Sequence, residues 1–158
     1  MSQRTQEKNA LTDQVEVKSS MNEDFGYKLA GANYDTLAPD GSEIRLLSAT
    51  SRGSMVHCTL NPGEVSMAVA HRTVEEVWYF LEGTGHVWRR EGSRERIVNV
   101  APGASLSLPV GTHFQFRTTG NRPLRFIIVT MPPWPGEDEA YPVPGHWPVN
   151  GGEGRSGT

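Results

Sequence analysis

Short strand-like stretches, divided by Pro and Gly at intervals of about 8 to 15 residues, constrain the fold of this 158-residue chain most strongly. No long stretch repeats apolar residues at the 3.6-residue period of an amphipathic helix. Eight segments between residues 43 and 131 are rich in β-branched, aromatic and alternating apolar residues: EIRLLSAT, SMVHCTL, EVWYFLEG, GHVWRRE, RIVNV, SLSLPV, HFQFRTT and LRFIIVTM. This spacing predicts an all-β, antiparallel sandwich or barrel.

The chain length suits a single domain. Residues 1–22 are polar and aperiodic, and they predict a disordered N-terminal arm. We expect residues 23–148 to form the domain and residues 149–158 to form a flexible tail. The proline-rich segment 135–148 cannot be a central strand, because proline lacks the N–H that a central strand must donate.

We expect this proline-rich segment to lie across one face or the mouth of the barrel. Trp134 and Trp147 would serve as its apolar anchors.

Charge and composition favour a cytoplasmic protein that binds neither nucleic acid nor membranes. The formal charge is −3 and the pI about 5.9, which gives no electrostatic reason to expect a nucleic-acid partner. No apolar run approaches the roughly 20 residues that cross a bilayer, and the polar N-terminus has no signal-peptide core. A single cysteine, Cys58, excludes an internal disulfide framework and fits a reducing compartment.

Two glycine-marked blocks, residues 63–85 and 103–118, resemble the two sequence motifs of the cupin superfamily. The first motif is Gly, five residues, His-x-His, three or four residues, Glu, six residues and Gly; the second is Gly, five residues, Pro-x-Gly, two residues, His, three residues and Asn. Seven positions of this chain match: Gly63, His71, Glu76, Gly83, Gly103, Pro109 and Gly111. The resemblance covers roughly residues 40 to 130. It implies a single jelly-roll barrel, also called a double-stranded β-helix, with a small-molecule pocket at one end.

The departures from these motifs concern the metal. The resemblance implies a metal centre of three histidines and a carboxylate around iron, manganese, nickel or zinc. Two of those four positions here hold Val69 and Phe114, neither of which can donate a lone pair. One imidazole and one carboxylate rarely hold a divalent ion firmly, so we predict no tightly bound metal or other cofactor.

An alternative register of one strand would restore a metal site. If His113 rather than Phe114 faced the barrel, His71, Glu76 and His113 would form a two-histidine, one-carboxylate site that suits non-haem iron. That register would expose Phe114 and Phe116 to solvent, at roughly 2 kcal/mol each. We therefore expect Phe114 to point inward.

The predicted pocket has one polar pair inside an apolar wall. By motif position His71 and Glu76 face the barrel, and they are the candidate catalytic residues. Thr73, in the loop between them, is a candidate for contacting a substrate hydroxyl or carboxylate, although an ordinary loop role is also open. The candidate wall residues are Val69, Trp78, Phe80, Phe114 and Phe116. Burial should raise the pKa of Glu76, whereas a protonated His71 beside it should lower that pKa and raise its own.

Three functions follow as hypotheses. The first is a metal-independent acid–base enzyme of the lyase (dehydratase), isomerase or cyclase type, with His71 as general base and Glu76 as acid or orienting group. The second is a metal-dependent oxygenase or lyase that uses His71, Glu76 and His113. The third is a non-catalytic ligand-binding barrel, since the same pair can be a buried structural pair. The family resemblance also makes a homodimer plausible.

Overall fold

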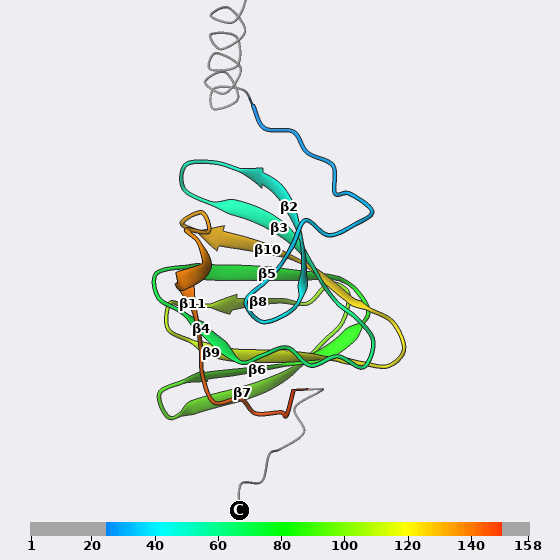
Figure 1. Cartoon of the computed structure of the whole chain (residues 1–158). Coiled ribbons are helices and arrows are strands. Elements are labelled where there is room, and N and C mark those ends of the chain that lie inside the picture. The colour runs from blue at the N-terminus through cyan, green and yellow to red at the C-terminus, as the bar shows by residue number, and fades with distance from the viewer. Residues whose placement is uncertain (1–24, 150–158) are drawn as a thin grey trace, which may run out of the picture.

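Two antiparallel β-sheets face each other and form a flattened barrel in the computed structural model, which describes residues 25–149 (Figure 1). The all-β jelly-roll prediction is confirmed. The predicted arm at residues 1–22 and residues 150–158 of the predicted tail lie outside the described residues. Among the residues described, no helix is long and apolar enough to span a membrane.

The larger sheet has six strands in the order β1-β2-β3-β10-β5-β8. Its strands are β1 (Thr36–Leu37), β2 (Glu43–Ala49), β3 (Ser54–Leu60), β5 (Glu75–Glu82), β8 (Ser105–Leu108) and β10 (Leu124–Met131). Strand β10 lies at its centre and pairs with β3 on one side and β5 on the other.

The smaller sheet has five strands in the order β11-β4-β9-β6-β7. Its strands are β4 (Val69–His71), β6 (Thr84–Glu91), β7 (Arg94–Val100), β9 (His113–Thr119) and β11 (Ala140–Pro142). A single 3-10 turn, η1 (Glu137–Glu139), precedes β11. The eight predicted segments correspond to β2, β3 and β5 to β10, whereas the short strands β1, β4 and β11 were not predicted.

Alternation of apolar and polar residues fixes which face of each strand is buried. Along β5, Glu76, Trp78 and Phe80 are buried while the residues between them are exposed. Strand β10 alternates in the same way over its whole length. Because successive side chains of a strand point to opposite faces, this pattern determines that Glu76 faces the interior.

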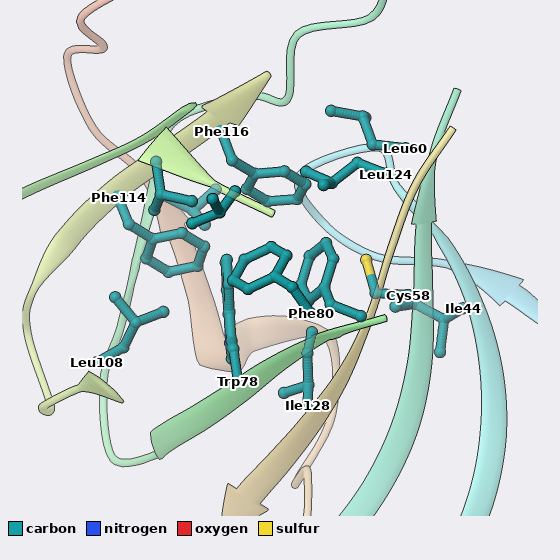
Figure 2. Close-up of a cluster of buried hydrophobic side chains, with 14 residues drawn as sticks. Ile44, Cys58, Leu60, Trp78, Phe80, Leu108, Phe114, Phe116, Leu124 and Ile128 are labelled. Carbon is teal, nitrogen blue, oxygen red and sulfur yellow. The ribbon is translucent and has the colours of Figure 1, made fainter. Parts of the chain in front are cut away.

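Between the sheets, an aromatic cluster forms the hydrophobic core (Figure 2). Trp78 lies at its centre, with its ring centroid 4.6 Å from Phe126, 5.3 Å from Phe116 and 5.5 Å from Phe114. Phe80 stacks on Phe126 at 4.8 Å. Phe80 and Phe116 are fully buried and do not line the cavity described below. The prediction that these two residues wall the pocket is therefore corrected, because they fill the part of the barrel interior that packing closes.

The proline-rich segment follows the outside of the smaller sheet, with β11 as its edge strand. The buried amide of Gln115, on the outer face of β9, holds it there. Its oxygen accepts the backbone N–H groups of His146 and Trp147, each at 2.9 Å, and its nitrogen donates to the carbonyl of Trp147 at 2.8 Å. Trp147 therefore anchors the segment against the sheet, as the sequence predicts.

Candidate ligand-binding site

A cavity of about 760 Å³ opens between the sheets, beside the aromatic core. Its volume falls within the range of about 300–1,000 Å³ that is usual for small-molecule sites. Five of the residues predicted for the pocket line it: Val69, His71, Glu76, Trp78 and Phe114. Strands β4, β5 and β9 supply them, so the two motif blocks meet at one wall, as the sequence predicts.

His71 ends the short strand β4 and lies against two aromatic rings. Its ring centroid is 5.2 Å from that of Phe114 and 5.1 Å from that of Trp134, both in edge-on contact. Only 6% of the residue is exposed. Burial in these apolar surroundings lowers the pKa of His71 to about 4, although the charge of Glu139 acts in the opposite direction. His71 is therefore a neutral imidazole at pH 7.

Glu76 faces the cavity from β5 and is held by its neighbour two residues along the strand. The indole N–H of Trp78 donates to Oε2 of Glu76 at 2.7 Å. Burial raises the pKa of Glu76 to about 8; the Trp78 hydrogen bond lowers it, and the nearby Asp40 raises it. The carboxyl group of Glu76 is therefore mainly protonated at pH 7.

The two side chains face each other across a gap. Nδ1 of His71 lies 3.8 Å from Oε1 of Glu76, which is longer than a hydrogen bond. The prediction that burial raises the pKa of Glu76 is confirmed. The opposing effect of a protonated His71 is absent, and the pKa of His71 is lowered instead of raised, because burial outweighs the attraction of the pair and leaves both groups uncharged. The cavity thus holds a free base beside a protonated acid.

Thr73 does not line the cavity. Its hydroxyl and its backbone N–H donate to the carboxylate of Glu139, at 2.8 and 2.6 Å. The backbone N–H of Val74 donates to the same carboxylate at 2.6 Å. The predicted contact between Thr73 and a substrate is therefore corrected, because Thr73 binds η1 and connects it to the loop that follows His71.

Segments outside the motif blocks complete the cavity wall. The turn between β1 and β2 contributes Asp40 and Ser42, and the residues after β10 contribute Pro133 and Trp134. Trp134 is expected from the sequence to anchor the proline-rich segment across one face or the mouth of the barrel, which is a partial signal for its place here. Asp40 gave none, since Pro39-Asp40-Gly41-Ser42 is typical of a surface turn.

The fold and the cavity define a jelly-roll barrel of the small-molecule-binding type. The Cupin domain family matches residues 56–130, so this chain contains a cupin domain.

The chain is similar to several known proteins. The uncharacterized protein MJ1618 of Methanocaldococcus jannaschii is 28% identical over 120 residues, which cover 70% of this chain and 93% of the relative. The crystal structure of BH2720 from Bacillus halodurans superposes with a TM-score of 0.54 at 24% identity, covering 60% of this chain and 73% of that one. Oxalate decarboxylase from Bacillus subtilis superposes with a TM-score of 0.62 at 17% identity, covering 75% of this chain and 31% of that one. At these identities the structural likeness shows the fold alone.

The donor groups of the cavity do not fit a cupin-type metal centre. Studies of the B. subtilis decarboxylase describe Mn(II) centres. The ability of the cavity residues to hold a metal ion is therefore relevant for a chain of this fold. Here Phe114 is 2% exposed and touches His71. His113, the next residue of β9, lies on the opposite face and does not line the cavity. Within residues 25–149, no group of three or more His, Cys, Asp or Glu side chains is placed to hold a metal ion. The inward position of Phe114 thus separates His113 from His71 and Glu76.

Proposed function

We propose that this chain is an acid–base enzyme of the lyase, isomerase or cyclase type that acts on a small organic molecule without a tightly held metal. The observation that carries the proposal is the uncharged His71–Glu76 pair, 3.8 Å apart in a mainly apolar cavity. A buried base and a buried acid on opposite sides of a small gap are what proton transfer to and from one substrate requires.

The roles follow from the protonation states. His71 accepts a proton from a carbon beside a carbonyl group, and Glu76 donates its proton to the carbonyl oxygen. The product is an enol, an imidazolium and a carboxylate. Transfer of the imidazolium proton to another carbon, with return of the enol O–H proton to Glu76, gives isomerisation. Transfer of the imidazolium proton to a β-hydroxyl group, which leaves as water while the enol O–H proton returns to Glu76, gives elimination. The charged pair that forms transiently is stabilised by its own attraction, which is strong at low effective dielectric constant.

The test uses an uncharged ketone whose α-protons are acidic. We expect the protein to accelerate deuterium exchange at the α-carbon of 2-tetralone in D₂O, followed by proton NMR. His71→Ala should reduce the rate to that of buffer, a loss of about a hundred- to ten-thousand-fold. Glu75→Gln, which changes the exposed neighbour of Glu76, should leave it unchanged.

Exchange that persists in His71→Ala would contradict the assigned role. No exchange above buffer with the wild-type protein would instead favour a non-catalytic ligand-binding barrel, which remains the second candidate because the same cavity supports it.

We further propose that the partner of this chain is a second copy, joined through the outer face of the larger sheet. Apolar side chains cross its central strands there: Val77 and Tyr79 of β5 are 43% and 51% exposed, and Met55 of β3 is 39% exposed. Such a patch is typical of an interaction site. At its rim Arg125 and Glu82 form an ion pair of 3.0 Å, so the face carries both signs of charge. A twofold-symmetric dimer can use such a face, because the positive charge of one copy can then lie near the negative charge of the other.

A further inference from the structure

A second buried acidic residue lines the cavity, and it comes from outside the motif blocks. Asp40 lies in the turn between β1 and β2 and is only 9% exposed. Its Oδ1 accepts the backbone N–H of Ser42 at 2.9 Å and the hydroxyl of Ser42 at 2.6 Å. Its backbone carbonyl accepts the N–H of Met67 at 2.8 Å, which ties the turn to the segment that leads into β4. The carboxyl group is therefore fixed in place, and both donors from Ser42 bind the same oxygen.

The hydroxyl groups of Ser54 and Thr130 also line the cavity, but they bind each other. Two buried polar positions are thus left for a ligand, with apolar side chains around them. Asp40 marks one position, and the His71–Glu76 pair marks the other. The apolar lining includes Ile44 and Ile128 besides Trp78 and Phe114. Asp40 contributes to the raised pKa of Glu76, so the two carboxyl groups are near enough to influence each other.

The charge of the lining restricts what can bind. Lys28, which is exposed, supplies the positive charge among the described residues that line the cavity. An anionic ligand would lie beside three acidic residues, Asp40, Glu76 and Glu137, without a buried cation, at a large desolvation cost. An ammonium ligand would have to form a buried ion pair with one of the carboxyl groups, and the desolvation of two charges can exceed their attraction. A hydroxyl group carries no charge to desolvate, and it can both donate and accept a hydrogen bond.

We infer that Asp40 is a ligand-contacting residue, and that the ligand is an uncharged molecule with two hydrogen-bonding groups on an apolar skeleton. One group binds between His71 and Glu76, and the other binds Asp40. The inference takes the cavity of the proposed function as the binding site, but it concerns binding and does not require turnover.

Three probes of one shape test the charge of the ligand. They are 6-(hydroxymethyl)-2-naphthol, 6-hydroxy-2-naphthoate and 6-(aminomethyl)-2-naphthol, which are neutral, anionic and cationic at pH 7. Binding is followed by the indole N–H signals of the four tryptophans in nitrogen-15-labelled protein. Trp78 and Trp134 line the cavity, whereas Trp88 and Trp147 lie on the outer face of the smaller sheet and serve as internal controls.

We expect the neutral probe to shift the signals of Trp78 and Trp134 and to bind at least about tenfold more tightly than either ion, a difference of about 1.4 kcal/mol. An ion that binds as tightly as the neutral probe would overturn the inference. So would the absence of shifts with all three probes, or shifts confined to Trp88 and Trp147.

The role of Asp40 is tested with a shortened probe, 2-naphthylmethanol, which lacks the second hydroxyl group. The wild-type protein should bind the neutral two-group probe about three- to tenfold more tightly than the shortened one, the usual range for one hydrogen bond. Asp40→Ala should abolish this preference, and Asp40→Asn, which keeps an acceptor for Ser42 and a polar group for the ligand, should retain most of it. If Asp40→Ala fails to fold, the preference of the wild-type protein and its retention in Asp40→Asn still test whether the ligand makes a second polar contact.

Equal affinity of the wild-type protein for both probes would exclude a second polar contact. The outcomes for binding and catalysis separate cleanly. Tight binding of the neutral probe without exchange of 2-tetralone would reject the proposed enzyme and leave this inference standing, whereas exchange without a preference for neutral probes would do the reverse.

Discussion

At the scale of single residues, burial decides the chemistry of the cavity. His71 and Glu76 would attract each other if both were charged, yet the pKa of His71 falls to about 4 and that of Glu76 rises to about 8. Removing each charge from water outweighs the attraction between them. A pair that looks like a salt bridge in the sequence motif is therefore a neutral base beside a neutral acid.

This state predicts how stability depends on pH. The unfolded chain loses the Glu76 proton near pH 4.5, whereas the folded chain keeps it up to about pH 8. In that interval the unfolded state binds fewer protons, so the free energy of unfolding falls as pH rises. His71 acts oppositely, but only below its ordinary pKa of 6.5. Between pH 6.5 and 8 the effect of Glu76 is larger than that of His71, and we expect the free energy of unfolding to fall by about 1–2 kcal/mol.

Urea denaturation of the wild-type protein and Glu76→Gln at pH 6.5 and 8 would measure this loss. The glutamine can still accept the indole N–H of Trp78 but cannot ionise, so the variant should lose much less stability over this interval. Glu75→Gln should behave as the wild type does. An unchanged pH dependence in Glu76→Gln would show that the carboxyl group of Glu76 titrates normally.

At the scale of elements, a short turn after the last long strand closes the wall of the cavity. Glu139, at the end of η1, accepts the backbone N–H groups of Thr73 and Val74 as well as the Thr73 hydroxyl. Arg72 adds a bond of 2.9 Å to the carbonyl of Asp138. These contacts hold the proline-rich segment, and with it Trp134, against the loop that follows His71.

We predict that Glu139→Ala frees this segment. Burial acts to raise the pKa of Glu139, but the hydrogen bonds from Thr73 and Val74 hold it below the ordinary value. The carboxylate therefore stabilises the fold fully above pH 4.5, and this contribution is lost as pH falls through the lowered pKa. Removing it should cost about 2–3 kcal/mol, because hydrogen bonds to charged groups are strong.

Amide hydrogen exchange provides the measurement. At pH 7 the N–H groups of Thr73 and Val74 should lose protection in Glu139→Ala but keep it in Asp138→Ala, where only the side chain of an exposed neighbour is removed. Equal protection in both variants would mean that Glu139 does not hold the segment.

At the scale of the whole molecule, the two faces of the larger sheet differ in what they carry. Its inner face carries the core and the cavity, and its outer face carries the exposed apolar row of Val77, Tyr79 and Met55. In β10, Val129 lies between Val77 and Met55, and Ile127 lies beside Tyr79. The row is therefore continuous across three neighbouring strands.

We expect the protein to be a dimer in solution, by light scattering after size-exclusion chromatography. Tyr79→Lys should shift it to the mass of a monomer, because a charge would be buried at the centre of the contact. Ile97→Lys changes an exposed apolar residue on β7 of the other sheet and should leave the dimer intact. A wild-type monomer, or a dimer unaffected by Tyr79→Lys, would contradict the proposed interface.

The sequence by itself determined the eight longer strands, the family resemblance and one wall of the cavity. Alternation along β5 and β9 was enough to predict that Trp78 and Phe114 point inward, because exposing large aromatic residues is costly. The spacing of the motif blocks likewise predicted that His71 and Glu76 share that wall. These properties depend on local patterns with a period of two residues, and such patterns can be read directly.

Only the tertiary structure decided what completes the cavity. Asp40 and Trp134 reach it from segments on either side of the cupin domain, and the carboxylate of Glu139 binds residues 65 and 66 positions earlier in the chain. The depth of burial that leaves His71 and Glu76 uncharged also depends on those segments. Long-range packing sets these contacts, and a local pattern carries no information about which distant residue will provide the neighbouring wall.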